Sequence, residues 1–416
     1  MKDNLVIVGI LFLLFVSVFS MSSKVHTAHA QTGTIYIRAD GSVDPSDAPV
    51  VTSDNVTYTL QSSVNASVII ERSNIILNGQ GHEIRGSGIL NATGIDITDR
   101  TNVTVKNVQV TRFTYGINLL RSSDCVVKQN NVTNNDNGIK LSSSYGNMIT
   151  ENKVNGSDNG IIMNLVSNFN SVTGNLIMNN TYAVRLEFGP NQNNSFLTNT
   201  VAKNQYAFVV LSSSLNTIYH NDFLNNTFPA FVDNSSLQNL WDNGYPSGGN
   251  HWSNYNGSDA NMNGIGDTAF TITRNATDNY PLMGTFHVFN AYQSNYVTVV
   301  SNSTIDSFSY VQSNSTILIR ASNSTVDQIF GFCRVSIPHA LMSGPYNVTV
   351  DGASPYYVNY TMYDNGTDRW IYLSYQHSTR EIVVVAEFQP LILMSASTVT
   401  TLLAVALWRG RRNNQR

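Results

Sequence analysis

Charged residues are scarce in this sequence of 416 residues, of which only 12% are Asp, Glu, Lys or Arg. About a quarter is usual for a soluble domain, so neutral polar groups must solvate most of this surface. The formal net charge of −4 provides no basic face, and we expect no nucleic-acid partner. The same scarcity argues against an active site built from clustered acids and bases.

Cysteine and the residues that build helices are also few. Cys125 and Cys333, the two cysteines, fall in segments that we assign to different domains, so each is predicted to be a buried small apolar residue. Ala, Glu, Lys, Leu and Arg are scarce, which argues against an all-α fold. Hydrophobic residues make up 42% of the chain and aromatic residues 10%, which disfavours intrinsic disorder.

Asparagine is the residue in excess, with 53 copies, and it accompanies an internal repeat. A small residue followed by an apolar one recurs every 22 to 24 residues, with short alternating strands and Asn, Ser or Gly turns between the copies. The copies are Gly94-Ile95, Gly116-Ile117, Gly138-Ile139, Gly160-Ile161, Ala183-Val184, Ala207-Phe208 and Ala230-Phe231.

This period is typical of one coil of a parallel β-helix, in which each strand pairs with its equivalent in the next coil. The leucine-rich horseshoe has a similar period, but its Leu consensus is missing. We expect about eight coils over residues 66–240, with an N-terminal cap at 31–65 that covers the open strand edges. Asn at the turns tolerates left-handed backbone and can stack its amides between coils.

The two ends of the chain predict export and anchoring. Residues 1–30 have the basic start, apolar run and Ala28-His29-Ala30 end of a signal peptide. Residues 387–409 are long and apolar enough for a transmembrane anchor, and the basic tail 410–416 should stay cytoplasmic. We therefore expect a single-pass protein of the cell membrane with its body outside the cell. The 18 Asn-x-Ser/Thr sequons from Asn55 to Asn365 predict surface glycosylation.

A Gly/Asn/Asp-rich segment, 241–287, follows the coils and resembles the first three-quarters of an EF-hand loop. Its calcium ligands would be Asp259, Asn261, Asn263, the carbonyl of Ile265, and Asp267. The twelfth position is Phe270, so the bidentate Glu of strong sites is absent. A bound calcium ion and a loop closed by its own Asx turns both fit this pattern. Residues 288–386 then alternate strand-like runs with turn signals and predict an antiparallel β-sandwich.

The coils, with the segments GGNHWSNYNGSDANMNGIGDTAFTI and DNYPLM, resemble the NosD-like (periplasmic copper-binding type) family over roughly residues 66–283. The segments GFCRVSIPHALMSGPYNVTVDG and IYLSYQHSTREIVVV resemble a β-sandwich module of archaeal surface proteins that precedes a C-terminal anchor. This resemblance implies a right-handed parallel β-helix, a β-sandwich and one transmembrane helix. Family members usually have Asp where this chain has Asn254 and Asn263, which weakens an implied cation site.

Three functions compete for this architecture. Copper handling, which the family name suggests, needs clustered His, Met or Cys, and the scattered His residues make copper unlikely. A polysaccharide lyase, hydrolase or epimerase needs clustered carboxylates. Its only candidates are Asp136 and Asp158, which occupy equivalent places in successive coils, and His220 with Asp222.

The third function is a non-catalytic surface module that binds polysaccharide or surface glycans, or serves surface architecture. Neutral amides, hydroxyls and aromatic platforms hold sugars without charge. The aromatic candidates are Tyr206, Tyr219, Tyr245, Trp252 and Tyr255, for which packing in the core or the cap is the alternative role. We expect this function, and a catalytic site is the less favoured alternative.

Overall fold

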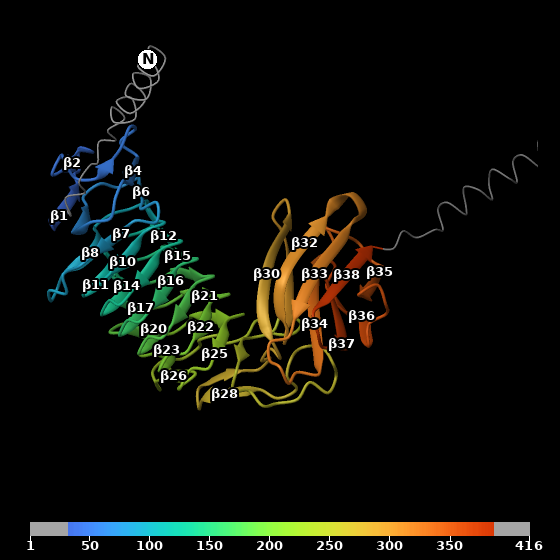
Figure 1. Cartoon of the computed structure of the whole chain (residues 1–416). Coiled ribbons are helices and arrows are strands. Elements are labelled where there is room, and N and C mark those ends of the chain that lie inside the picture. Colours follow the sequence, from blue (N-terminus) through green and yellow to red (C-terminus); the bar gives the residue numbers. More distant parts are fainter. Residues whose placement is uncertain (1–31, 387–416) are drawn as a thin grey trace, which may run out of the picture.

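The computed structural model describes residues 32–386, and these residues are almost entirely β-strand and turn (Figure 1). Their one helical element is a 3-10 turn, η1 (Gln312–Asn314), so no helix in this part of the chain could cross a membrane. The expected signal peptide, 1–30, and transmembrane anchor, 387–409, lie outside the described residues.

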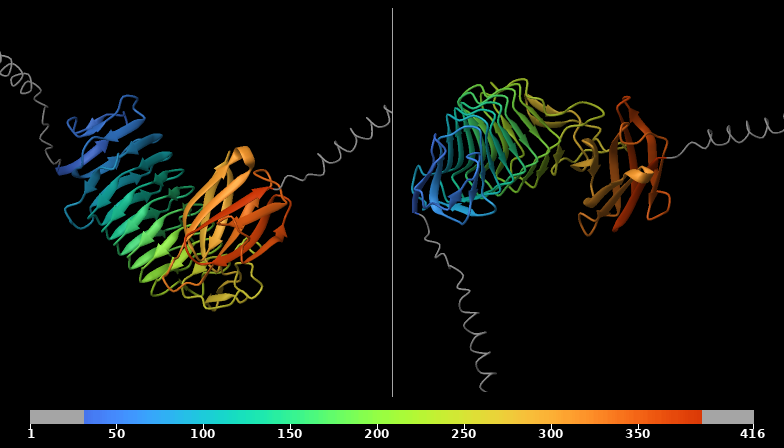
Figure 2. Two further views of the ribbon diagram at one scale, coloured as in Figure 1. Left: turned by 45° about the vertical axis from the view of Figure 1, so that its right-hand side comes forward. Right: turned by 90° about the horizontal axis from the view of Figure 1, so that it is seen from above.

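Three parallel sheets run side by side along a rod, and Figure 2 shows the coils stacked one behind another. The first sheet contains, in spatial order, β2 (Val43–Asp44), β1 (Thr32–Ile37), β5 (Asn65–Ile70), β8 (Thr93–Thr98), β11 (Tyr115–Leu120), β14 (Asn137–Ser142), β17 (Asn159–Asn164), β20 (Tyr182–Glu187), β23 (Tyr206–Val210) and β26 (Phe231–Val232). The antiparallel strand β2 ends it beside β1.

The second and third sheets complete each coil. The second contains β24 (Thr217–Tyr219), β21 (Ser195–Leu197), β18 (Ser171–Thr173), β15 (Met148–Thr150), β12 (Val126–Lys128), β9 (Val103–Lys106), β6 (Ile75–Asn78), β4 (Thr57–Leu60) and β3 (Val50–Val51). The third contains β27 (His251–Trp252), β25 (Asp222–Leu224), β22 (Thr200–Ala202), β19 (Leu176–Met178), β16 (Lys153–Asn155), β13 (Asn131–Thr133), β10 (Gln109–Thr111) and β7 (Glu83–Arg85). Its eight strands, one from each coil, confirm a β-helix of about eight coils.

The register of the first sheet follows the predicted repeat except at its last step. Ile161 pairs with Val184, and Val184 pairs with Phe208, as the repeat predicts. At the last step Val209 pairs with Phe231, so the prediction that Ala230-Phe231 matches Ala207-Phe208 is wrong by one residue. The last step is 22 residues, the same spacing at which Tyr206 and Phe228 form an isolated bridge and stack their rings 4.7 Å apart.

Asparagine ladders hold the corners of the coils together. At the corner between the second and third sheets, each buried Asn donates its side-chain N–H to the amide oxygen of the next, and the same oxygen accepts the backbone N–H of the Asn before it. The members of this ladder are Asn130, Asn152, Asn175, Asn199, Asn221 and Asn250. A second ladder, between the first and second sheets, contains Asn147, Asn170, Asn194, Asn216 and Asn239.

The left-handed backbone expected at the turns belongs to the residue before each ladder Asn, except at Asn250. Gln129, Glu151, Thr198 and His220 all have positive φ between 56° and 57° and directly precede an Asn of the longer ladder. The Asn makes the ladder hydrogen bonds, and the residue before it adopts the left-handed backbone. Cys125 occupies the ladder position of its coil, where its backbone N–H donates to Asn147 Oδ1 at 3.0 Å, which explains a buried free cysteine there.

After the coils, a hairpin of β28 (Phe270–Thr273) and β29 (Ala276–Asp278) leads to two antiparallel sheets with one shared core. One sheet contains β30 (Thr285–Tyr292), β31 (Asn295–Ser301), β34 (Phe330–Pro338), β37 (Asp368–Gln376) and β36 (Tyr357–Asp364). The other contains β32 (Thr304–Val311), β33 (Thr316–Ser322), β38 (Arg380–Ala386) and β35 (Tyr346–Val350). Cys333, a free buried cysteine, lies in this core.

The loop segment joins this C-terminal pair of sheets to the end of the β-helix. Ile265 and Leu282 from the loop pack with Phe286, Phe332 and other side chains of the first of these sheets. The guanidinium of the buried Arg334 donates to the carbonyl of Pro246. The two parts of the molecule are thus fixed to each other through a small apolar core and one buried cation.

Candidate functional site: an amide-lined groove on the β-helix

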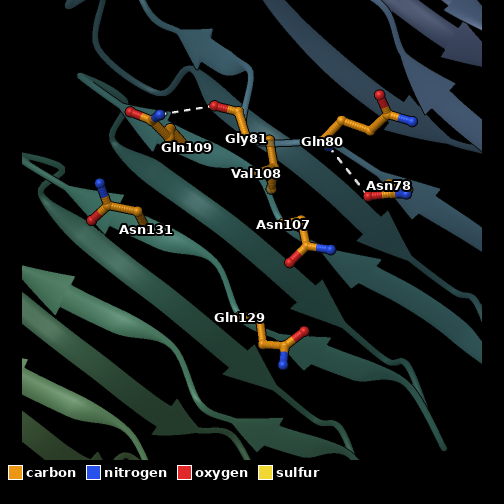
Figure 3. A pocket seen from close by; sticks show the side chains of 8 residues that line it. All are labelled: Asn78, Gln80, Gly81, Asn107, Val108, Gln109, Gln129 and Asn131. Atoms are coloured by element: carbon orange, nitrogen blue, oxygen red, sulfur yellow. Dashed lines mark hydrogen bonds between the residues drawn. The ribbon is translucent and has the colours of Figure 1, made fainter.

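An open groove of about 450 Å³ lies on the corner between the second and third sheets in the N-terminal coils (Figure 3). Carboxamide side chains dominate its lining, together with Gly81 and Val108. The six carboxamides are Asn78, Gln80, Asn107, Gln109, Gln129 and Asn131. They come from three successive coils, so the groove runs along the axis of the rod.

The backbone of the corner explains why these side chains point outward. Asn107 and Gln129 have positive φ of 53° and 56°, the left-handed turn that precedes each ladder position. Gln109 and Asn131 start β10 and β13 and are paired in register across the coils. In each coil the residue at the ladder position, Val108 or Asn130, points into the core. The residues on either side of it therefore face solvent.

Hydrogen bonds orient part of the lining and leave part of it free. Gln109 Nε2 donates to the carbonyl of Gly81 at 2.8 Å, as Figure 3 shows. Gln129 Nε2 donates to Glu151 Oε2 at 2.8 Å, one coil beyond the groove. Asn131 Oδ1 is buried and has no partner. This oxygen has almost no solvent-accessible surface, so a ligand in the groove could donate to it only after the Asn131 side chain rotates.

Two of the sequence-predicted acids lie elsewhere on the surface. Asp136 and Asp158 occupy equivalent positions in successive coils, since Asn137 pairs with Asn159, and both side chains are exposed. They follow the corner between the third and first sheets, and Asp136 borders a shallow hollow with Arg112. No described base lies within hydrogen-bonding distance of either carboxylate.

His220 and Asp222 come together under the C-terminal pair of sheets. Asp222 Oδ1 accepts the backbone N–H of Phe286 at 3.0 Å and lies 3.8 Å from Nδ1 of His251. The ring of His220 stacks on Phe286 with centroids 3.9 Å apart. These groups therefore fill the junction between β-helix and sheets and do not line an open cleft.

Burial shifts the pKa values of the acid and the histidines at this junction. It raises the pKa of Asp222 to about 8 and lowers the pKa of His220 to about 4. It also lowers the pKa of His251 to about 4, with a further contribution from the nearby His287. Near neutral pH these groups are mainly uncharged, which suits a dry interface.

The five aromatic candidates are not gathered on one surface. Trp252 is buried between Phe223 and Phe270, with ring centroids 4.3 Å and 4.6 Å away. Tyr255 packs near Phe270 and donates its hydroxyl to the carbonyl of Thr268 at 2.6 Å.

Each of the other three aromatic candidates has its own neighbours. Tyr245 meets Tyr363 of the C-terminal sheets, and Tyr219 lies against His220. Tyr206 stacks between Tyr182 and Phe228 on the outer face of the first sheet.

The predicted calcium loop is closed by hydrogen bonds to its own backbone. The two carboxylate oxygens of Asp259 accept the N–H groups of Asn263 and Gly264, at 2.9 Å and 2.8 Å. Asp267 Oδ2 accepts the N–H of Ala260 at 2.7 Å.

The remaining predicted ligands lie beside one another. A cavity of about 390 Å³ is lined by Asn261, Asn263, Ile265 and Asp267 among others. The same loop thus contains both the Asx-type hydrogen bonds and the oxygen atoms predicted to bind calcium.

The described residues do not fit a copper centre. Within residues 32–386 no group of three or more His, Cys, Asp or Glu side chains could hold a metal ion. At the junction, Nε2 of His220 already lies 3.1 Å from the carbonyl of Ser247, and Nε2 of His287 lies 2.9 Å from the hydroxyl of Thr285.

Sequence reasoning missed the amide groove. Its signal was present, because Gln129 and Asn131 flank the ladder residue Asn130 and recur one coil earlier as Asn107 and Gln109. The surplus of Asn indicates turns as a class and does not by itself separate inward-facing from outward-facing positions. The groove is made by the outward ones.

The family model for the periplasmic copper-binding protein (NosD) matches residues 50–257. No curated protein sequence matches the chain. Among solved structures, the chain is similar to the Dettilon tailspike protein, at 11% identity over 85% of this chain and 85% of that chain, with a TM-score of 0.37. The enzymatically active domain of bacteriophage CBA120 tailspike protein 2 has 12% identity, coverage of 78% and 73%, and a TM-score of 0.37. The family match includes every residue of the groove.

Proposed function

The chain belongs to the NosD family of periplasmic copper-binding proteins, and we propose that this member binds a neutral polysaccharide in the amide-lined groove without cleaving it. The observation that carries the proposal is the lining itself, in which six carboxamides from three coils form one open groove that contains no ionisable side chain. General acid–base chemistry has no group to act there.

Carboxamides suit sugar hydroxyls because each offers two N–H donors and an acceptor oxygen. Neighbouring coils are about 4.8 Å apart, so the groove repeats its donors and acceptors along the rod. An extended polymer lying along the axis could therefore use several coils at once.

The proposed setting is the outer surface of a cell. The expected signal peptide, the expected C-terminal anchor and the many sequons support a body held outside the membrane. Scarce charge is compatible with this role, because neutral amides and hydroxyls recognise neutral sugars.

Binding of the full-length protein to neutral polysaccharides tests the proposal. Retention on insoluble cellulose, chitin and mannan, with calorimetry on the matching oligosaccharides, would identify a ligand. We expect Gln109→Ala with Asn131→Ala to weaken binding about tenfold or more, since each lost hydrogen bond contributes about 0.5–1.5 kcal/mol. Gln205→Ala is the matched control, because Gln205 is an exposed amide on another corner.

The competing functions give different results in the same samples. Release of reducing or unsaturated ends from the polysaccharide would make the protein an enzyme and overturn the non-catalytic proposal. Stoichiometric copper binding, followed by absorbance, would favour a copper-handling role. Absence of binding to every neutral glycan would refute the groove proposal itself.

A further inference from the structure

Five large apolar side chains are exposed together on the corner between the first and second sheets. Their exposed fractions lie between 50% and 67%, and they come from three consecutive turns, 143–147, 165–170 and 188–194. We call this set the apolar ridge, and its members are Tyr145, Leu165, Val166, Phe169 and Phe188. Exposed apolar groups gathered in this way mark interaction surfaces.

The ridge is continuous from coil to coil. The N–H of Leu165 donates to the carbonyl of Phe188 at 3.2 Å, which places these two turns directly against each other. Tyr145 pairs with Asn168 in an isolated bridge, so the earlier turn lies against the middle one. In Figure 1 these turns follow β14, β17 and β20, in the middle of the rod.

Four members of the ridge have a backbone conformation that is unfavourable for large side chains. Leu165, Val166, Phe169 and Phe188 have positive φ of 52°, 67°, 57° and 54°. For a β-branched residue such as Val166 this is a genuine outlier. Strained residues of this kind persist at functional surfaces.

Other coils show what folding alone requires at these positions. The position of Phe188 is occupied by Ser143 in an earlier coil, and that of Phe169 by Gly146 and Asn193 in its neighbours. Small or polar residues therefore fit the turn with less strain. The turn itself therefore does not require a large apolar residue at these positions.

The charges around the ridge favour a second copy of this chain as its partner. The three turns contain no Asp, Glu, Lys or Arg. In a two-fold dimer each surface group faces its own equivalent region, so an uncharged surface meets no like-charge repulsion. One exposed carboxylate, that of Asp124 in the preceding turn, lies against Gly146 at one end of the ridge.

The exposed area of the ridge also approaches the area that each partner of a stable dimer buries. The five side chains expose on the order of 600 Å², and a standard interface buries about 800 Å² on each partner. Flanking Ser and Asn side chains of the turns supply the remainder.

We propose that the apolar ridge is the contact surface of a homodimer, in which two β-helices pack ridge to ridge about a two-fold axis. The ridge lies on a different corner from the amide groove, so dimerisation does not depend on the proposed glycan binding and leaves the groove open.

Sedimentation equilibrium of the full-length protein tests the dimer. The variant Leu165→Ser, Phe169→Gly and Phe188→Ser gives these positions the small residue types of other coils and should fold at least as well. We expect a wild-type dimer at micromolar concentration, a monomeric ridge variant with an unchanged or higher melting temperature, and a dimeric Leu90→Ser control. Leu90 is 82% exposed and lies outside the ridge.

Three results would overturn the proposal. The first is a wild type that is monomeric up to about 100 μM. The second is a ridge variant as dimeric as the wild type, which would place the contact elsewhere. The third is a glycan on Asn193 in the isolated protein, detected by glycopeptide mass spectrometry. Asn193 is exposed beside Phe169 within an Asn-Asn-Ser sequon, and a glycan there would occupy the ridge.

Discussion

The carboxylate of Asp278 accepts the backbone N–H of Asn250 at 2.7 Å, and this bond ends the longest asparagine ladder of the β-helix. The same oxygen accepts the indole N–H of Trp252 at 2.8 Å. A single buried acid from the segment DNYPLM therefore closes a ladder of six asparagines and orients the tryptophan that covers the last coil.

Replacement of this acid should destabilise the C-terminal end of the β-helix. Asp278→Ala leaves the N–H groups of Asn250 and Trp252 without an acceptor, and we expect a loss of about 3 kcal/mol in the free energy of unfolding. Asp278→Asn keeps one acceptor oxygen and should lose less. Denaturant unfolding followed by tryptophan fluorescence measures both, and equal midpoints for Asp278→Ala and wild type would contradict the role.

A substitution in the middle of the ladder should be as costly. Asn175→Ala removes the oxygen that accepts both the backbone and the side-chain N–H of Asn152, and also removes the donor to Asn199. We expect a loss of about 3 kcal/mol, because each buried polar group left unpaired costs about 1–3 kcal/mol. The matched control is Asn134→Gly at an exposed left-handed turn, which should change stability by less than about 0.5 kcal/mol. Similar losses for both variants would mean that the ladder has no special part in stability.

Stability should fall as the pH rises from about 6.5 to about 8. Asp222 has its pKa raised to about 8 by burial, so the folded protein retains a proton that the unfolded chain has already released. The stability from this group is complete below its ordinary pKa of 3.8 and is lost as the pH rises through 8. His220 and His251, with pKa values lowered to about 4, act in the opposite direction and only below about pH 6.5.

Asp222→Asn isolates this effect, since its amide oxygen can still accept the N–H of Phe286. Between pH 6.5 and 8 we expect the variant to lose about 1–2 kcal/mol less than the wild type. Asp278, with its pKa raised to about 7, contributes a smaller pH dependence of the free energy of unfolding in both proteins. If the free energy of unfolding fell equally in the two proteins between pH 6.5 and 8, Asp222 would be excluded as the source of the pH dependence.

Calcium should raise the melting temperature if the loop around Asp259 and Asp267 binds the ion. A ligand that binds only the folded state stabilises it by RT ln(1 + [L]/Kd), about 2.7 kcal/mol at a hundred times Kd. We expect millimolar calcium to raise the melting temperature of the wild type by a few degrees relative to EDTA, and Asp267→Asn to remove the shift. An unchanged wild-type melting temperature would leave Asx closure as the whole explanation of the loop.

Much of the fold could be predicted because the repeat has a fixed physical meaning. Strands that pair only with the equivalent strand of the next coil must keep a nearly constant spacing, and Gly94, Gly116, Gly138 and Gly160 display it. The prediction failed at Phe231, where the step is one residue shorter than the repeat suggests and Phe228 packs on Tyr206. Local pattern cannot anticipate a packing contact of that kind.

The site was less accessible to sequence reasoning. For Trp252 and Tyr255 the sequence leaves sugar contact and packing open, and tertiary packing places Trp252 in the core and Tyr255 against Phe270. His220 and Asp222 are near each other as expected, yet β30 covers them. That cover comes from residues more than sixty positions later, and no spacing rule within the coils contains it.

Binding of a neutral polysaccharide in the amide groove can be measured by calorimetry of three full-length proteins with an oligosaccharide of the polymer that retains the wild type. The three proteins are the wild type, the Gln109→Ala/Asn131→Ala variant and the Gln205→Ala control. We expect measurable binding by wild type and control and at least about tenfold weaker binding by the groove variant. Equal affinity of all three proteins would contradict it.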